Sequence, residues 1–537
     1  MSLPENSDAV ATVSVVDQRL QRLATLEKLL AAGVNPFGGR VEDRISTAAA
    51  RDMFQESEQL AMEEVAIASS PVTGIMPALG VAMTAAPAPL TLPEIEVSAV
   101  LAGRVMTMRL MGKSIFADLR DETGRMQLYA QKNVLGEEAF AAFKALDLGD
   151  WVSVRGQIFK TRAGEVTLRV QSFDLQSKAL RPMPEKWHGL TDVEQRYRQR
   201  YVDLIGNDDA RRLFRLRAEM IRQIRDVLAA KGFMEVETPM LQPIPGGAAA
   251  RPFKTFYNAL DCPMYLRIAP ELYLKRLLVG GFEKVFEVNR NFRNEGLSRR
   301  HNPEFTMLEI YQAFGDCRTM MELVEELVTT VAQRTLGTLE VTNPDGKLIN
   351  LQRPWRRVTY AELVTEKMGA GWYELSREAK QEAARALGLK VDGSWNDQEI
   401  THEIYEKTIE STLLQPTFVT RLPAELVPLA KRCADDPAVV DVFELEINGQ
   451  EIAPGYSELN DPVEQRRRFE AQATRVHGTV DEESGTVDED FLTALEFGMP
   501  PAGGMGMGID RLVMLLTGSA SIRDVILFPQ LRPEKSA

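Results

Sequence analysis

Cysteine is scarce in this chain, since its 537 residues contain only Cys262, Cys317 and Cys433. Their odd number and wide separation exclude a disulfide framework and the paired spacing of zinc-binding motifs. The N-terminus also lacks the cationic start and apolar stretch of a secretory signal. Together these absences predict a protein of the reducing cytoplasm.

Charge is absent from residues 65–93, a stretch long enough to cross a lipid bilayer. Five prolines and two glycines interrupt it. Proline removes backbone hydrogen bonds that a helix in lipid requires, so we expect no membrane span. We interpret residues 44–95 as an Ala/Pro-rich insertion. It follows an N-terminal helical extension, residues 1–43, with a helix expected at about residues 17–32.

The bulk composition allows several domains, because 537 residues exceed what a single core supports. A hydrophobic content of 44% and a charged content of 26% are typical of soluble globular proteins. The net charge of −14 argues against a protein that coats nucleic acid, although a local basic patch still attracts phosphate. The arginine-rich residues 196–225 are compatible with a solvated helix face or with an approach path for nucleic acid.

Short stretches of alternating apolar and polar residues occupy the chain between about residues 96 and 178. The expected strands are residues 97–105, 114–120, 125–130, 151–160 and 165–175, with one helix at 137–146. Five strands with one helical interlude predict a small closed barrel of the OB type, which binds single-stranded nucleic acid by stacking bases on aromatic rings. Phe116 is the candidate stacking residue, although a lone Phe on a strand is equally compatible with the barrel core.

Glycine occupies every second position of residues 504–508, directly before Arg511 and an apolar run. Alternate glycines leave one face of an extended strand without side chains, so a flat group can lie against it. An arginine at the start of the following helix can bind phosphate or stack on a ring. The alternative is an ordinary glycine-rich loop before a buried helix.

A second segment, residues 292–305, links two stretches of alternating residues and is dense in arginine. Arg293 suits a phosphate, Glu295 accepts from an adenine amino group, and Phe305 can stack on the base. The alternative is a surface hairpin whose charges face water.

Taken together, residues 292–305 and 504–511 resemble motifs 2 and 3 of the class II aminoacyl-tRNA synthetases. Residues 213–239 resemble motif 1, whose strand ends at Pro239 at the dimer interface of that family. Residues 244–252, 266–275 and 456–461 resemble its lysyl branch in particular. The resemblance covers about residues 19–533.

The resemblance implies an α+β fold. An anticodon-binding OB barrel at residues 96–178 precedes a catalytic domain at residues 179–537, an antiparallel sheet flanked by helices. It also implies a symmetric homodimer. Arg109, Gln127 and Glu165 would join Phe116 in reading a U-rich anticodon.

The implied activity is ATP-dependent ligation of L-lysine to its tRNA through a lysyl-adenylate. Reaction at phosphorus requires alignment and neutralisation of charge rather than an enzyme nucleophile. The resemblance gives Arg293 to the α-phosphate, Glu295 to the adenine amino group, His301 to the distal phosphates, and Phe305 and Arg511 to the two faces of the base. Arg293 and Arg511 are the implied catalytic residues.

Metal and amino-acid sites follow from the same resemblance. Glu444 and Glu451 match its magnesium ligands, and carboxylates suit that hard cation. The implied amino-acid site comprises Gly247, Glu271, Glu309, Tyr311, Tyr456 and Glu458. Among these, Glu309 and Glu458 would bind the ε-ammonium, which is costly to bury unpaired. Gly247 and Glu271 would meet the α-amino group, and the tyrosines would form walls. We expect His301 to be neutral because cations surround it.

One departure from the lysyl pattern lies at Ala453 and Pro454, where Gly-Asn is usual. Proline cannot replace the asparagine amide, so we expect a neighbour such as Asn460, or a water molecule, to supply the missing hydrogen bond. Three alternatives stay open. An aspartyl or asparaginyl enzyme would need cations where this chain has Glu309 and Glu458. A tRNA-binding regulatory relative would not need the complete nucleotide set, and a protein-lysylating relative usually lacks the barrel.

Overall fold

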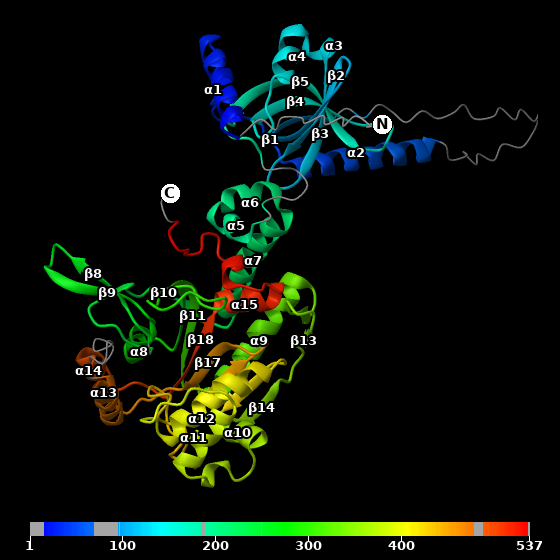
Figure 1. Cartoon of the computed structure of the whole chain (residues 1–537). Helices are drawn as coiled ribbons and strands as arrows, with labels where there is room; N and C mark the ends of the chain where they lie inside the picture. Colours follow the sequence, from blue (N-terminus) through cyan, green and yellow to red (C-terminus); the bar gives the residue numbers. More distant parts are fainter. Residues whose placement is uncertain are drawn as a thin grey trace, which may run out of the picture. The chain divides into compact units, whose positions relative to one another are not determined.

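The computed structural model describes residues 15–68, 95, 97–183, 190, 192–248, 250–476 and 487–534. The chain divides into two compact units, Met1–Trp187 and His188–Ala537, which Figure 1 colours from blue to red along the sequence. Residues 69–94, the greater part of the uncharged stretch, lie outside the described residues. No helix in the described ranges is long and apolar enough to cross a membrane.

The first unit contains the expected five-stranded closed barrel, whose strand order is β1-β2-β3-β5-β4. Its elements are β1 (Val97–Met111), β2 (Ser114–Arg120), β3 (Arg125–Gln131), α3 (Lys132–Leu135), α4 (Glu137–Lys144), β4 (Trp151–Lys160) and β5 (Val166–Ser177). Leu101, Leu119, Leu128 and Leu168 fill the core and are fully buried. Strand β1 extends beyond its expected end because residues 107–111 continue to pair with β2 after an irregularity in register.

Helix α2 (Thr47–Ala68) occupies much of the segment that composition assigned to an Ala/Pro-rich insertion. The backbone amide of Thr47 donates to Asp121 Oδ2 at 2.7 Å, which joins the start of the helix to the barrel. Ala50 and Phe54 are buried in the barrel core, and Lys160 pairs with Glu58 at 2.7 Å. Residues 47–68 are therefore part of the barrel unit.

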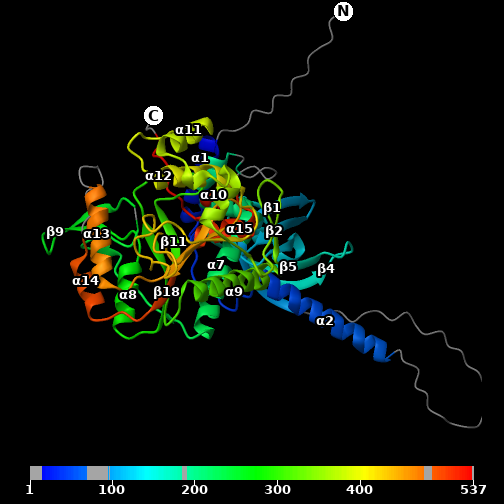
Figure 2. The same ribbon diagram turned by 90° about the horizontal axis from the view of Figure 1, so that it is seen from below.

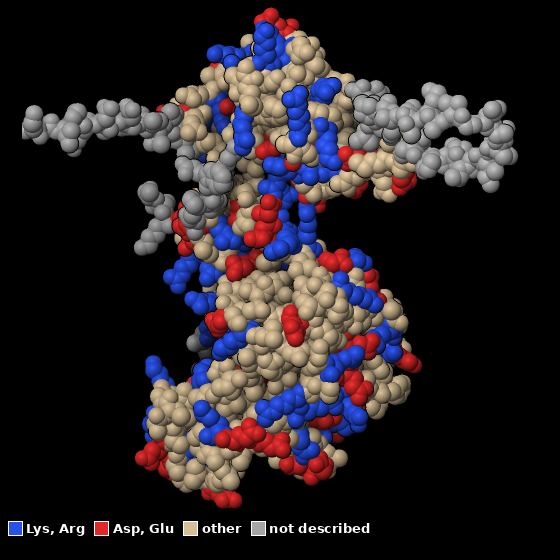
Figure 3. Space-filling model, turned by 90° about the vertical axis from the view of Figure 1, so that its right-hand side faces the viewer, with Lys and Arg blue, Asp and Glu red and all other residues tan. Residues whose placement is uncertain are grey.

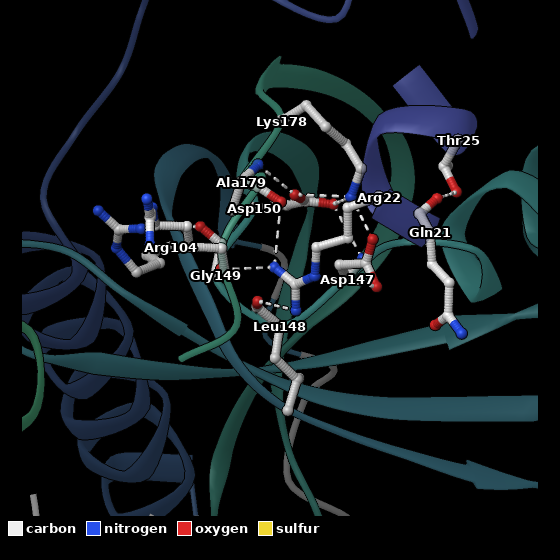
Figure 4. Close-up of polar contacts among 11 residues, drawn as sticks. Gln21, Arg22, Thr25, Arg104, Asp147, Leu148, Gly149, Asp150, Lys178 and Ala179 are labelled. Atoms are coloured by element: carbon white, nitrogen blue, oxygen red, sulfur yellow. Dashed lines mark hydrogen bonds and ion pairs between the residues drawn. The ribbon is translucent and has the colours of Figure 1, made fainter. Parts of the chain in front are cut away.

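Helix α1 (Val15–Ala31) confirms a helix in the N-terminal extension, and polar contacts fix it to the barrel. Figure 4 shows the Arg22 guanidinium pointing from α1 toward backbone carbonyls. It donates to the carbonyl oxygens of Leu148, Ala179 and Arg181 at 2.9–3.2 Å. Beside it, Lys178 pairs with Asp150 at 2.9 Å, and both side chains are fully buried. Arg22 thus holds the chain where it leaves β5.

The second unit is built on an eight-stranded sheet in the order β14-β15-β16-β17-β18-β11-β10-β6. Its strands are β6 (Met234–Glu235), β10 (Lys284–Phe292), β11 (Glu304–Ala313), β14 (Arg356–Thr359), β15 (Thr417–Thr420), β16 (Val442–Glu446), β17 (Glu451–Ser457) and β18 (Ala502–Gly508). Neighbours from β15 to β10 run antiparallel, and only the two edge pairs are parallel. The expected antiparallel sheet flanked by helices is confirmed.

One face of this sheet carries the main core. Helices α7 (Asp208–Ala230) and α9 (Cys317–Leu336) lie side by side in Figures 1 and 2, and α15 (Ile509–Thr517) follows β18 directly. Met505 and Met507 of β18 are buried with them. Because side chains alternate along a strand, the glycines of β18 face the opposite side of the sheet. The Gly-Met repeat therefore supplies core on one face and open space on the other.

The remaining elements surround the sheet. They are α5 (Val193–Arg198), α6 (Arg200–Gly206), β7 (Leu241–Gln242), β8 (Phe253–Tyr257), β9 (Cys262–Leu266), α8 (Glu271–Val279), β12 (Glu340–Thr342), β13 (Leu348–Asn350), α10 (Tyr360–Met368), η1 (Trp372–Glu374), α11 (Arg377–Ala386), α12 (Asp397–Ile404), η2 (Tyr405–Ile409), η3 (Glu410–Thr412), α13 (Pro462–Val476), α14 (Glu489–Glu496) and α16 (Ile522–Val525). Within the arginine-rich stretch, Arg200 is buried and donates to the carbonyls of Arg523 and Leu527. This arginine is structural.

Candidate active site

Strands β11, β17 and β18 bring together residues that are far apart in the sequence. Tyr311 and Tyr456 both stand opposite Gly504, and Glu309 stands opposite Gly506. A Cβ atom added to Gly504 would lie 1.9 Å from Glu458 Oε1, and one added to Gly506 would lie 2.5 Å from the Met307 methyl. Glycine is thus required at position 504, which Glu458 and Tyr311 cover, whereas a side chain at position 506 would displace only the flexible end of Met307.

An open pocket of about 850 Å³ lies at the other end of this face. Its lining includes all five residues predicted for the nucleotide, Arg293, Glu295, His301, Phe305 and Arg511, together with Glu451 and Pro454. An added Cβ on Gly508 would meet only Arg511, at 3.7 Å, so this end of the glycine strand stays uncovered. The structure therefore gathers the two arginine-containing segments around one cavity.

Arg293 follows β10 and lines the pocket beside Phe305. Its guanidinium carbon lies 5.2 Å from the centre of the Phe305 ring, within the range of a cation–π contact. Burial lowers the pKa of Arg293, and the carboxylates of Glu451, Glu295 and Glu309 oppose that shift. Because an arginine stays protonated even so, it brings a positive charge to the pocket. Its Nε atom is buried and has no hydrogen-bond partner in the protein.

Arg511 and His301 form a second polar pair at the pocket. Arg511 Nη1 donates to the backbone carbonyl of Glu451 at 2.7 Å, and Nη2 lies 3.2 Å from His301 Nε2. An arginine can only donate, so Nε2 accepts, and the ring proton on Nδ1 faces Ser298 Oγ at 2.8 Å. Burial, more than Arg511, lowers the pKa of His301. The neutral ring was predicted, but cations are the lesser cause.

Asp510 holds these segments together, a role that the sequence pattern did not indicate. Its Oδ2 accepts from the Thr306 backbone amide at 2.8 Å, and its Oδ1 pairs with Arg217 Nη1 at 2.7 Å. The side chain is 2% exposed. Asp510 thereby joins the start of α15 to β11 and α7. These contacts fix the position of the adjacent Arg511.

A buried polar cluster lies under the covered end of β18, and its members come from α8, β11, β17 and the residue after β17. Lys275 Nζ pairs with Glu271 Oε1 at 2.7 Å and also with Glu458. Tyr456 donates its hydroxyl to Glu271 Oε1 at 2.7 Å, and Tyr311 donates to Glu309 Oε2 at 3.0 Å. Lys275 was missed from the sequence, although it lies one helical turn after Glu271.

Glu309 differs from its neighbours because no cation of the protein is within ion-pair distance of it among the described residues. Burial, with a further contribution from Glu271, raises the pKa of Glu309 to about 8. Gly247 adjoins this cluster in a left-handed conformation, with φ of 85°, and a Cβ there would lie 3.1 Å from Glu271 Cβ. The predicted amino-acid residues thus form one site.

Glu444 and Glu451, the predicted metal ligands, come from the adjacent strands β16 and β17. Burial raises the pKa of Glu444 well above its usual value, and the carboxylates of Glu451, Glu410 and Glu406 raise it further. A cation at this position would relieve that repulsion. Among the described residues, however, no three or more acidic, histidine or cysteine side chains already have the arrangement of a metal site.

Ala453 and Pro454, which stand where Gly-Asn is usual, lie on opposite faces of β17. Ala453 is fully buried in the main core, whereas Pro454 lines the open pocket. Asn460 does not replace the missing amide, because its Nδ2 donates to the Met499 carbonyl at 3.2 Å and its Oδ1 accepts from Lys431 at 3.5 Å. The missing hydrogen bond would therefore come from another neighbour or from a water molecule.

On the barrel, the predicted base-stacking residue is partly exposed. Phe116 is outside the core cluster and stacks on Tyr129, with ring centres 4.7 Å apart and ring planes at 27°. Arg109 stands opposite Phe116 in the neighbouring strand. Gln127 Oε1 accepts from Thr167 at 2.9 Å, and Glu165 pairs with Arg125 at 3.2 Å. The four predicted residues lie on β1, β2, β3 and beside β5, and Tyr129 adds a second ring to their surface.

Comparisons with known proteins agree with this arrangement. Residues 192–532 match the family model described as class II tRNA synthetases (D, K and N), and residues 99–175 match an OB-fold nucleic acid binding domain. A lysine–tRNA ligase of Carboxydothermus hydrogenoformans is 49% identical over 521 residues, covering 97% of this chain and 98% of its own. Lysine–tRNA ligases of Pelotomaculum thermopropionicum and Xylella fastidiosa are 54% and 53% identical, each over 81% of this chain and 86% of its own.

Proposed function

The chain belongs to the class II tRNA synthetases, within them to the lysine–tRNA ligases, and we propose how its residues carry out that reaction. It joins L-lysine to its cognate tRNA at the expense of ATP. A lysine carboxylate oxygen forms a bond to the α-phosphorus while the bond to pyrophosphate breaks. The terminal tRNA hydroxyl then attacks the carbonyl carbon of the lysyl-adenylate, and AMP leaves. An altered amino-acid specificity or a regulatory role without activation is not favoured.

The open pocket is the proposed ATP site, and the observation that carries the proposal is that five predicted residues line it. Arg293 would neutralise the α-phosphate, with its unpartnered Nε directed to that charge. Phe305 and Arg511 would hold the adenine, and Glu295 would accept from its amino group. His301, neutral and bonded to Arg511, would face the distal phosphates without acting as a base.

Magnesium is the proposed metal, and Glu444 and Glu451 would hold it. The support is the repulsion between these carboxylates, which a divalent cation would relieve. When bound, magnesium would spread the negative charge of the phosphates. The protein's own contribution is to keep both carboxylates on neighbouring strands beside Arg511, whose Nη1 lies 3.7 Å from Glu451 Oε2.

The buried cluster is the proposed lysine site. Glu309, which lacks a cationic partner, would bind the ε-ammonium together with Glu458. Glu271 and Gly247 would receive the α-amino group, while Tyr311 and Tyr456 would form the walls. Pyrophosphate exchange with a panel of amino acids tests this assignment. Preference for an amino acid other than lysine would overturn it.

A U-rich anticodon is the proposed ligand of the barrel surface around Phe116. Between residues 97 and 177 there are eleven Lys and Arg against nine Asp and Glu, although the whole chain has a net charge of −14. The barrel is therefore less repulsive to phosphate than the rest of the chain. The rings of Phe116 and Tyr129, already stacked, offer a platform for a base.

Phe116→Ala is expected to weaken tRNA charging by roughly 1–3 kcal/mol in kcat/KM for tRNA, the contribution of one base stack. Lysine-dependent pyrophosphate exchange should stay unchanged, because that reaction needs no tRNA. Steady-state charging and exchange measured on the same preparation separate the two effects. An equal fall in both would show that Phe116 is only structural.

Restoring the usual pair with Ala453→Gly and Pro454→Asn is expected to change KM for lysine by less than about tenfold. A full hydrogen bond to a charged group contributes about 1.5–3 kcal/mol, or roughly ten- to a hundredfold in affinity. We expect the smaller effect because a water molecule can replace the amide and because Glu309 and Glu458 are unchanged. Exchange kinetics at varied lysine concentration measure it. A larger fall in KM for lysine would show that no group in the natural pocket replaces the missing hydrogen bond.

A homodimer in the cytoplasm is the proposed state of the protein. Figure 3 shows a broad area of the second unit in which Lys, Arg, Asp and Glu are nearly absent. Met234, which belongs to the motif 1 segment, and Leu241, which follows it, are 40% and 49% exposed. Apolar surface of this kind favours association of identical subunits. The three cysteines are unpaired, as in a reducing compartment.

A further inference from the structure

Lys275 lies inside the proposed lysine site, where an enzyme that selects a cation would not be expected to bury one of its own. Its side chain is fully buried, and its ammonium contacts both Glu271 and Glu458. The ammonium also lies 5.5 Å from the centre of the Tyr456 ring. Lys275 thus occupies a space bounded by groups that suit a substrate ammonium, and it leaves less of that space for the ligand.

The charges of the cluster balance only with a particular kind of ligand. Glu271, Glu309 and Glu458 bring three carboxylates and Lys275 brings one ammonium, so two further cations are needed if all three carboxylates are to be ionised. The nearby Arg267 does not alter this balance, since it pairs with Glu287 at 2.7 Å. L-Lysine has two ammonium groups, and its carboxylate is outside this balance because it forms a bond to the α-phosphorus in the proposed reaction. A bound lysine therefore neutralises the pocket, whereas an amino acid with one ammonium leaves a buried charge unpaired.

Lys275 also orients Glu458. It pairs with Oε2, while Oε1 is buried, has no hydrogen-bond partner and faces the bare backbone of Gly504. Burial alone would lower the pKa of Lys275, but Glu271 and Glu458 outweigh that effect and raise it. The ammonium therefore stays charged and holds the Glu458 carboxylate through Oε2 alone.

We propose, on the basis of the proposed lysine site, that Lys275 is a specificity-determining residue. It supplies a fixed cation in addition to the two ammonium groups of the substrate, so that the remaining pocket accepts an amino acid with two ammonium groups. Without Lys275, three carboxylates would face two ammonium groups, and one of them would have to take up a proton. Lysine binding should weaken while the chemical step, at the other end of the sheet, changes little.

The first experiment compares Lys275→Met with the natural enzyme in lysine-dependent pyrophosphate exchange. We expect KM for lysine to rise about tenfold or more, with kcat within about threefold, since the lost contact acts on binding. Lys380→Met is the matched control, because Lys380 is also buried and pairs with Asp397 at 2.6 Å, outside the site. Thermal melting of both variants monitors folding. A KM within twofold of the natural value in folded Lys275→Met would overturn the proposal.

Chemical rescue of Lys275→Ala separates charge from packing, because propylammonium has the same atoms as the deleted part of the side chain. Added propylammonium should lower KM for lysine in this variant, whereas 1-propanol should not. In the natural enzyme the amine can only compete. Equal rescue by both compounds would assign Lys275 a packing role, and the KM of Lys275→Met decides the question if Lys275→Ala does not fold. Failure of the natural enzyme to activate lysine would instead overturn the proposed function.

Discussion

Arg293→Ala is expected to slow lysyl-adenylate formation by about 10²- to 10³-fold, the usual effect of removing one group that stabilises charge in a transition state. KM for ATP should rise by less than about tenfold, because phosphate charge redistributes during the reaction and Arg511 still holds the base. Pyrophosphate exchange at saturating lysine and varied ATP measures both quantities. Unchanged exchange kinetics would refute the assignment of Arg293.

Two further substitutions sharpen that experiment. Arg290→Ala is the matched control, because Arg290 lies on the same strand, is 40% exposed and pairs weakly with Glu304 at 3.8 Å, outside the pocket lining. Its exchange rate should stay within about twofold, as is usual for an exposed ion pair. Arg293→Lys keeps the positive charge but loses the planar fork, and an intermediate rate is expected. A Lys variant as slow as Arg293→Ala would show that geometry matters more than charge.

The alternation of glycine and methionine in β18 allowed one half of the site to be predicted. Period-two alternation requires that the two residue types face opposite sides, and Met505 and Met507 are indeed in the core. The sequence could not show what covers the glycines, since that depends on the register of β11 and β17 against β18. In the structure, Glu458 and Tyr311 cover Gly504, so only the end near Gly508 is free for a flat ligand.

Lys275 shows a second limit of sequence patterns. Its spacing from Glu271 on α8 predicts at most a helical salt bridge, which is usually a surface feature. The partner that the helical spacing does not reveal is Glu458, which follows β17 and is far from Lys275 only in the sequence. Helix α2 was missed for a related reason, because the burial of Ala50 and Phe54 becomes apparent only against the barrel.

Glu309→Gln is expected to raise KM for lysine by about 10²- to 10³-fold, because removing one partner of a buried ion pair costs about 3–5 kcal/mol. Among the described residues, Glu309 is the pocket carboxylate without a cation of the protein beside it. The substitution therefore removes the carboxylate that the substrate ammonium alone would neutralise. The kcat at saturating lysine should change far less, since the ε-ammonium is remote from the reacting phosphorus. Tyr311→Phe, which removes only the 3.0 Å hydrogen bond to Glu309, provides a milder comparison.

The pH dependence of KM for lysine is a second test of Glu309, because a defect in packing alone would not produce it. With a pKa of about 8, Glu309 is mostly protonated in the free enzyme below pH 8, and it must lose that proton to pair with an ammonium. Each pH unit below 8 then costs about 1.4 kcal/mol, so KM for lysine should fall about tenfold per unit as pH rises from 6 to 8. Glu309→Gln has no such proton to lose, so its KM should depend less steeply on pH, and the remaining dependence would come from Glu458, whose pKa burial also raises to about 8. Equal slopes in the natural enzyme and the variant would show that another group controls binding, and Glu309 would lose its place as the ligand of the ε-ammonium.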